Sequence, residues 1–154
     1  MDYIIDEETL KGSVEFEVSQ VADAAYAEDG TPLYDSVVLT EKDDDTVLAF
    51  IDDAIRVVIS ALQDIAYYAT STSTDETSHV TTVTNKITFN VPDIDVSQGG
   101  QLTLNIDSFI KAFVCAGLFR QRRPSLVDEY VSRAQIALDN VKSLLRKRQA
   151  PTRS

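Results

Sequence analysis

The chain has 154 residues, 44% of them hydrophobic, and a formal net charge of −11. This length and hydrophobic content fit one folded domain with its own core, and they argue against a largely disordered chain. The charge is unevenly divided, because residues 1–110 carry a net of −18 and residues 111–154 a net of +7. The first residues are acidic and no uninterrupted run of about 18 apolar residues occurs, so we expect neither a signal peptide nor a membrane span.

The first predicted helix covers residues 7–27. Its acidic first turn suits a helix N-terminus, and its apolar residues recur at spacings of three and four, namely Leu10, Val14, Val18, Val21 and Ala25. Asp29 and Gly30 then predict a turn, and Pro32 prevents the helix from continuing.

The second predicted helix, residues 45–69, is apolar around more than one face. Such a helix is buried on most sides, so neighbouring subunits could supply part of its cover. Asp43, Asp44 and Asp45 stand where an N-cap and first-turn carboxylates are expected. They lack the alternating ligands, central glycine and closing glutamate of an EF-hand calcium loop.

A β-hairpin is predicted in the insert at about residues 80–106, after a Thr- and Ser-rich stretch that we expect to be a solvated loop. Residues 86–91 and 101–106 alternate apolar with polar side chains, which predicts two paired strands, and residues 80–84 could extend the first. An isolated hairpin is only marginally stable in water. We therefore expect it to contact the helices or another chain through Ile87, Phe89, Val91, Leu102 and Leu104.

Two further helices are predicted at residues 107–123 and 125–148, with Pro124 ending the first of them. The sequence Ser125-Leu-Val-Asp128 has the form of a capping box that opens the second, and residues 149–154 form a short basic tail. The predicted fold class is thus mainly α. It is a single domain, residues 1–154, with a bundle of about four helices and a β-hairpin inserted between the second and third.

No catalytic or metal-binding motif is recognisable. His79 is the only histidine and lies in the polar stretch, whereas Cys115, the only cysteine, lies in a hydrophobic helix and is expected to be a buried small side chain. Gly99 and Gly100 open no phosphate-binding sequence. We therefore expect no enzymatic activity, no metal and no cofactor.

A basic cluster is the candidate site for a charged ligand, and it comprises Arg120, Arg122, Arg123, Arg146, Lys147 and Arg148. An acidic protein surface is the ligand that we favour. Nucleic acid is an alternative, although the acidic remainder would repel it and no interleaved aromatic residues or reading motif accompany the cluster. The remaining alternative is that these residues are solvated helix ends.

The order of elements resembles that of head–tail connector proteins of tailed bacteriophages, also called adaptor or head-completion proteins. The resemblance is carried by the helix LAFIDDAIRVVISALQDIAYYA, the insert TFNVP to QLTLNI, and the helix LVDEYVSRAQIALDNVKSLLRKR. It covers roughly residues 45–150, and it is a pattern of elements without signature residues.

The resemblance implies a structural virion protein, made in the host cytoplasm, that forms a ring at the portal vertex. Such a ring, commonly twelve-fold, would join the portal protein to tail proteins and extend the channel through which DNA passes without sequence-specific binding. The basic cluster would then dock on an acidic partner such as the portal. The alternative function is a small helical regulatory or DNA-binding protein that uses its basic C-terminal segment.

Overall fold

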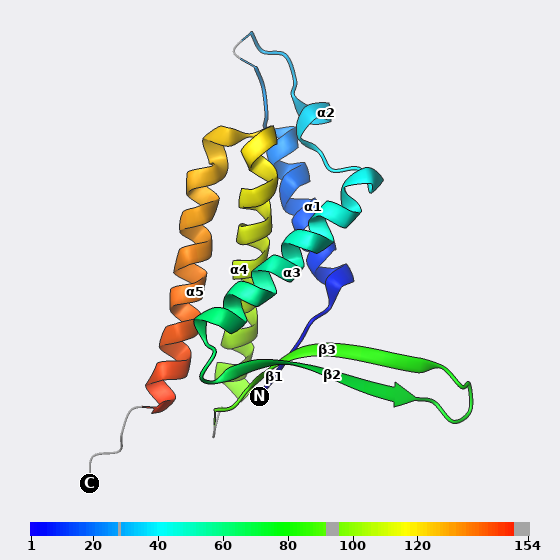
Figure 1. The fold of residues 1–154 in the computed structure, drawn as a ribbon. Coiled ribbons are helices and arrows are strands. Elements are labelled where there is room, and N and C mark those ends of the chain that lie inside the picture. Colours follow the sequence, from blue (N-terminus) through cyan, green and yellow to red (C-terminus); the bar gives the residue numbers. More distant parts are fainter. Residues whose placement is uncertain (28, 92–95, 150–154) are drawn as a thin grey trace.

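Four long helices and a three-stranded antiparallel sheet make up the computed structural model, which describes residues 1–27, 29–91 and 96–149, without the side chains of residues 36, 96, 97 and 146–149 (Figure 1). The helices are α1 (Glu7–Asp23), α3 (Asp44–Ala61), α4 (Val96–Arg122) and α5 (Val127–Gln149), and α2 (Tyr34–Val37) is a single turn. The predicted fold class, a helical bundle with an inserted hairpin, is confirmed.

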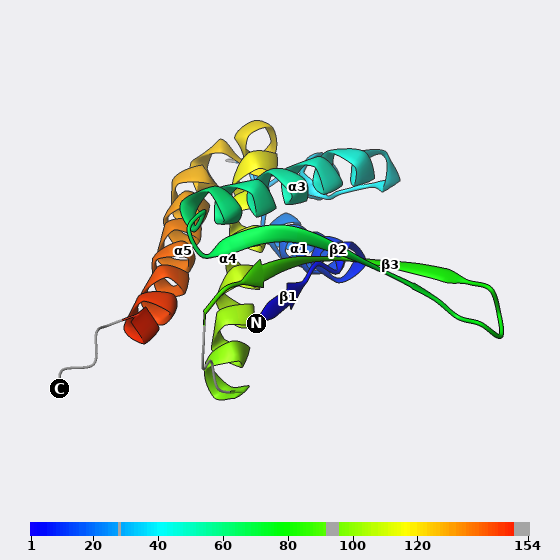
Figure 2. The same cartoon turned by 60° about the horizontal axis from the view of Figure 1, so that its bottom comes forward.

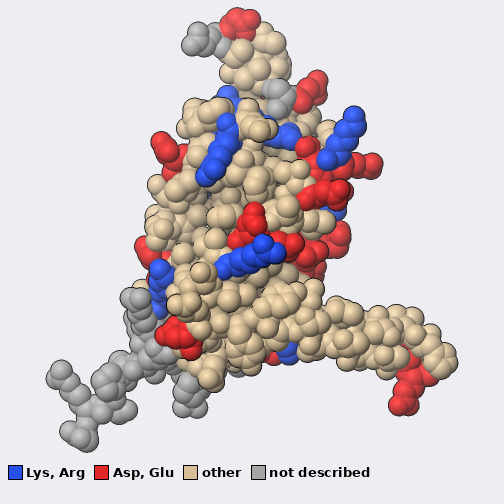
Figure 3. All heavy atoms as spheres, in the orientation of Figure 1, with Lys and Arg blue, Asp and Glu red and all other residues tan. Residues whose placement is uncertain are grey.

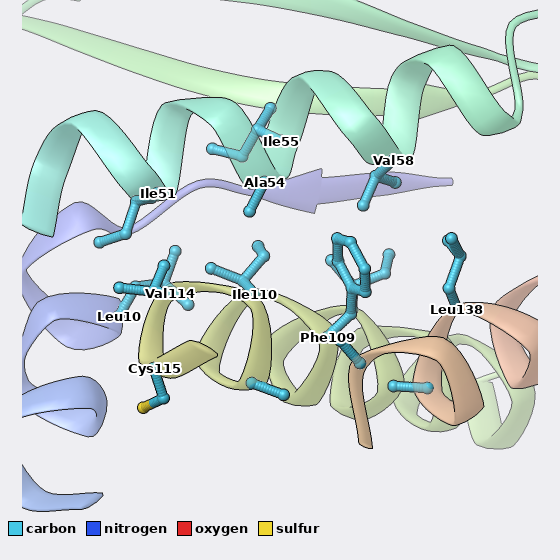
Figure 4. Close-up of a cluster of buried hydrophobic side chains, with 14 of the residues drawn as sticks. Leu10, Ile51, Ala54, Ile55, Val58, Phe109, Ile110, Val114, Cys115 and Leu138 are labelled. Atoms are coloured by element: carbon cyan, nitrogen blue, oxygen red, sulfur yellow. The ribbon is translucent and has the colours of Figure 1, made fainter. Parts of the chain in front are cut away.

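Helix α4 is the central element, because α1, α3 and α5 all pack against it. Its buried Phe109, Ile110 and Val114 face Ile51 and Ala54 of α3 across the core (Figure 4). Among the described residues, the segment Gln98–Arg122 is long and apolar enough to cross a membrane by length and composition alone. However, 56% of its most apolar window is buried inside the fold, as expected for a helix covered by three neighbours.

The sheet has the order β1-β3-β2, so the N-terminal strand and the hairpin form one surface. Strand β1 (Asp2–Ile4) pairs with residues 86–88 of β3 (Thr81–Phe89), and β2 (Ala66–Thr74) pairs with β3 along its whole length. Ile87 and Phe89 of β3 are buried in the core together with Tyr3 of β1. This end of the sheet is therefore anchored on the helices.

The first helix ends earlier than predicted, at Asp23 rather than at residue 27. Its N-terminus is capped by Asp6, whose carboxylate accepts a hydrogen bond of 3.1 Å from the Thr9 amide. Beyond the helix, Tyr26 forms a β-bridge with Pro32, and this pairing requires the chain to reverse between them. Gly30 has φ of +86°, so the predicted turn is confirmed at a position that favours glycine.

The prediction that residues 101–106 form a strand is wrong, since they belong to the first half of α4. Leu102 and Ile106 are buried while Leu104 is 67% exposed, which places Leu102 and Ile106, four residues apart, on one helical face and Leu104 on the other. The side chains of Thr103 and Asn105 bond to carbonyls four residues back, Gly99 and Gln101 respectively. An alternating apolar run of this length fits either period, and packing on α5 selects the helix.

The strand that pairs with β3 is β2, and it covers residues that the sequence predicts to be the end of the second helix and a loop. The second helix ends at Ala61 rather than at residue 69, and residues 70–74 are strand rather than loop. Tyr67, Tyr68 and the threonines that follow favour extended structure, and pairing with β3 satisfies their backbone groups. The fourth helix also starts later, at Val127, after a 3-10 turn at Pro124–Leu126.

Candidate functional site

A β-ribbon projects from the bundle far beyond the helices, as both ribbon views show (Figures 1 and 2). We call residues 70–85 the arm. The third strand, β1, ends beside Lys86, and the following Ile5 amide donates a last hydrogen bond of 2.8 Å to the Asn85 carbonyl. Residues 70–83 are exposed without exception, so the described part of the chain covers neither face of the arm over that range.

The arm is an ordered ribbon closed by a well-bonded turn. The Asp75 carboxylate accepts hydrogen bonds from the amides of Thr77 at 2.7 Å and Ser78 at 3.2 Å, which hold its pKa below the usual value. Thr74 and Thr81 share a hydrogen bond between their hydroxyls at 3.1 Å. His79 has φ of +57°, so it is a turn residue.

Charge is almost absent from the arm. From Ile65 to Asn85 the only charged residues are Asp75 and Glu76, both at the turn, and Figure 3 shows an arm without charge apart from acidic atoms at its tip. Edge strands of monomeric proteins usually carry charges or prolines that block pairing with another chain. The nine residues of β2 have neither, so this edge lacks the usual protection.

One face of the arm continues the buried face of the sheet. In the ladder, Tyr68 is opposite Ile87 and Thr72 is opposite Val83, which places these four residues on the same face as the buried Phe89. Ile87 lies in the core, whereas Val83 is 58% exposed. Beyond the part that the helices cover, this face therefore carries one apolar side chain, Val83, among threonines and Asn85.

A second feature is a groove of about 450 Å³ between three helices, which we call the α3–α4–α5 groove. The groove is partly open to solvent, and most of the residues that line it are apolar. The apolar ones are Phe50, Val57, Phe109, Phe113, Ala116, Gly117, Val131, Ala134 and Leu138, and the polar ones are Asp53, Arg120 and Gln135. A Cβ on Gly117 would lie 3.2 Å from the Phe50 ring. Glycine at this position thus lets that ring lie against α4 and form a wall of the groove.

The predicted basic cluster does not form one free patch. Arg122 is turned inward, where its guanidinium donates hydrogen bonds to the Val38 carbonyl at 3.0 Å and to the Asp43 carboxylate at 2.6 Å. Arg123 is half-buried, and its Nε is buried without a partner among the described residues. Arg120 alone of the three is exposed, and it makes no hydrogen bond or ion pair with the described part of the chain.

The other predicted basic residues give no support for a convergent site. The side chains of Arg146, Lys147 and Arg148 lie outside the described residues, as does the tail from residue 150. Arg133, which was not part of the predicted cluster, lies on the surface of α5, where it contacts the carboxylates of Glu17 and Glu129 and the Tyr130 ring. The site residues predicted on the hairpin are also dispersed: Ile87, Phe89, Val91 and Leu102 are core residues, and only Leu104 is exposed.

Reactive groups are not gathered elsewhere in the described structure. Cys115 is fully buried, and burial raises the pKa of its thiol to about 12. Residues 1–27, 29–91 and 96–149 contain no group of three or more metal-ligating side chains. The projecting arm and the groove are therefore the candidate functional surfaces.

The sequence did not predict the groove, and of the arm it predicted only the second strand, from about residue 80. A signal for the arm was present, since Ile65–Thr74 is a run of ten residues without charge in a chain of which 25% is charged. No comparable signal marks Phe50 and Phe113 as neighbours across the groove. Comparison with protein-family models, curated proteins and solved structures found no match.

Proposed function

We propose that this chain is a structural virion protein, a head–tail connector subunit that forms a ring between the portal and the tail. The observation that carries the proposal is the arm, a projecting ribbon with an unprotected edge and an exposed apolar side chain, Val83. A two-stranded ribbon without cover is marginally stable in water, so a partner surface is expected to bury it. In a head-to-tail ring each subunit uses two different surfaces, so the projection of one copy can be covered by the next.

The charge distribution supports head-to-tail assembly. On the face drawn in Figure 3, acidic side chains gather on the side of α1 and the start of α3, away from α5. The C-terminal 44 residues carry the net positive charge. Subunits that repeat in one direction would bring unlike charges together, which favours one orientation of docking and accelerates the encounter.

The proposed assembly is a ring, twelve-fold by analogy with connectors, that binds the portal on one side and tail proteins on the other. DNA would pass through the lumen, where the acidic surface keeps it from adhering. Catalysis is no part of this proposal. The alternative of a DNA-binding protein is weakened by Arg122, whose guanidinium is bonded inside the fold to Asp43 and to the Val38 carbonyl.

Co-sedimentation tests the function. Capsids that carry a portal are incubated with the purified chain and compared with capsids of the same phage that lack one. The connector proposal predicts binding to the first and none to the second. Equal binding to both, or binding to neither, would contradict it.

A further inference from the structure

We propose that the arm of one copy lies in the α3–α4–α5 groove of the next copy. The inference rests on the proposed function only in that both require the chain to self-assemble. It assigns a definite occupant to the groove and a definite surface to the arm. Three properties of the described residues support it: apolar complementarity, matching lengths and opposite charge.

The apolar surfaces correspond. Val80 and Val83 are exposed on the arm, while Phe50, Val57 and Phe113 of the groove are only partly covered within their own chain. Val131 on the α5 wall is 47% exposed. Each surface removes apolar area from water when the other covers it, and this burial is the main driving force for association.

The lengths correspond as well. The exposed ladder pairs Thr70–Thr74 with residues 81–85, and five residues of strand span roughly 16 Å at about 3.3 Å per residue. The groove follows α4 from Phe109 to Arg120, which is also roughly 16 Å at 1.5 Å per residue. The arm can therefore lie along the groove with its turn at the Arg120 end.

Charge fixes that orientation. The two carboxylates of the arm, Asp75 and Glu76, stand at its turn, and Arg120 stands at one end of the groove without an ion-pair partner among the described residues. The groove also contains Asp53 on the α3 side. Its carboxylate faces an arm rich in Thr and Ser hydroxyls, which can donate hydrogen bonds to it.

Geometry makes the contact intermolecular and repeatable. The arm leaves the bundle on the side opposite α5, as Figures 1 and 2 agree, so it cannot reach the groove of its own chain. An arm-to-groove contact uses two different surfaces of each copy and leaves one of each free at the ends of a dimer. The same contact can therefore repeat from copy to copy, and it forms a ring when the rotation between successive copies closes. Because β2 and β3 are already paired in the arm, docking costs less conformational entropy than it would for an unpaired chain.

Photo-crosslinking tests the contact directly. A benzophenone amino acid replaces Val83 in the full chain, and copies with heavy and normal isotopes are mixed so that adducts between copies can be recognised by mass. The proposal predicts that irradiation of the assembled protein links position 83 to peptides containing Phe113 or Val131 of another copy. The same reagent at Phe16, an exposed residue of α1, should give no such adduct. Adducts with strand β2 of another copy, or none between copies, would overturn the proposal.

Complementation provides a second test that does not depend on the register. We expect Val83→Lys and Val131→Lys each to weaken self-association roughly ten- to a hundred-fold, because one buried valine is lost from the contact. In an equimolar mixture of the two variants, the intact arm of Val131→Lys can bind the intact groove of Val83→Lys. Sedimentation should therefore detect a heterodimer. Ile136→Lys changes an exposed residue of α5 outside the groove and should assemble like the unmodified chain. A mixture that stays monomeric would contradict the proposal.

These results separate the two proposals. Self-assembly and portal binding with position 83 linked outside the groove would leave the connector function standing and overturn the arm–groove contact. If the expected adduct forms but the protein does not bind portal-bearing capsids, the arm–groove contact stands and the connector function is overturned. Circular dichroism of each variant distinguishes a lost contact from a lost fold.

Discussion

Arg122 and Asp43 form an internal ion pair, with 2.6 Å between Nη2 of the guanidinium and Oδ1 of the carboxylate. The same guanidinium donates a hydrogen bond to the Val38 carbonyl, so the end of α4 is joined to the connector that precedes α3. The side chain of Arg122 is only 23% exposed. This arginine therefore stabilises the fold and is poorly placed to bind a partner.

We expect Arg122→Ala to lower the free energy of unfolding by about 1.5–3 kcal/mol, the range for hydrogen bonds to charged groups with little exposure. Arg120→Ala is the matched control, and it should change the free energy by less than about 0.5 kcal/mol because the residue is exposed and has no ion-pair partner among the described residues. Urea titration followed by circular dichroism measures both. Equal stability of the two variants would show that the internal pair contributes nothing.

Asp107 accepts a short hydrogen bond from the hydroxyl of Tyr3, which joins strand β1 to α4. Burial raises the pKa of Asp107 above its usual value of 3.8, although the Tyr3 hydroxyl opposes that shift. The folded chain thus holds this proton more tightly than the unfolded chain. The contribution of this group to stability is complete below pH 3.8 and is lost as the pH rises through the folded-state pKa.

We therefore compare the stability of Asp107→Asn with that of the unmodified chain at each pH. The difference should favour the variant more at neutral pH than at pH values below 3.8. The asparagine oxygen can still accept the Tyr3 hydrogen bond but carries no charge to bury. Tyr3→Phe should be destabilised by about 1.5–3 kcal/mol at neutral pH, because the carboxylate loses its donor. Thermal unfolding at several pH values measures both effects, and a pH-independent difference for Asp107→Asn would contradict the account.

Cys115 should be inert in the folded protein. Its thiol is fully buried and has a pKa of about 12, so thiolate is scarce and reagents cannot reach it. We expect an aromatic disulfide reagent to release no chromophore from the native chain at neutral pH and one equivalent after unfolding in denaturant. Rapid reaction of the native chain would show that the helices packed around Cys115 of α4 separate readily.

Charge at the tip of the arm should govern assembly. We expect Glu76→Lys and Arg120→Glu each to weaken self-association, and the two changes together in one chain to restore part of it. Asp64→Lys, an exposed position in the turn before β2 and outside the groove, is the control with the same charge change. Sedimentation at low and high salt measures the effect. If the double variant assembles no better than either single one, these two side chains do not meet.

Duplex DNA should bind weakly or not at all. Among the described residues no cluster of free basic side chains forms, and the net charge of −11 repels phosphate. The alternative function predicts measurable affinity that falls steeply as salt rises. Fluorescence anisotropy with a labelled duplex at several salt concentrations distinguishes them, and tight salt-dependent binding would favour the DNA-binding alternative.

Hydrophobic periodicity predicted the four long helices because each buries a face that recurs along the chain. It failed where that signal was ambiguous or absent. Leu102, Leu104 and Ile106 alternate like a strand, yet Leu102 and Ile106 also have helical spacing, and packing on α5 decides between them. Strand β2 carries almost no apolar side chains beyond Tyr68, so its period of two could not be seen.

The candidate site was harder to predict because it depends on contacts between distant residues. Arg122 and Asp43 are 79 positions apart, and no local pattern shows that one neutralises the other. The groove likewise depends on the angles at which α3, α4 and α5 meet, and no local sequence pattern reveals those angles. The sequence did predict a hairpin between the second and third helices, although with the wrong second strand, and its contact with a neighbouring chain stays a prediction.

Imaging of portal vertices tests the central claim most directly. Phage heads with a portal are incubated with the purified chain and examined by cryo-electron microscopy, with heads alone as the control. The account predicts a closed collar of repeated subunits at the portal vertex, each with an arm that reaches the next subunit. Portal vertices with and without the chain that look identical would contradict it.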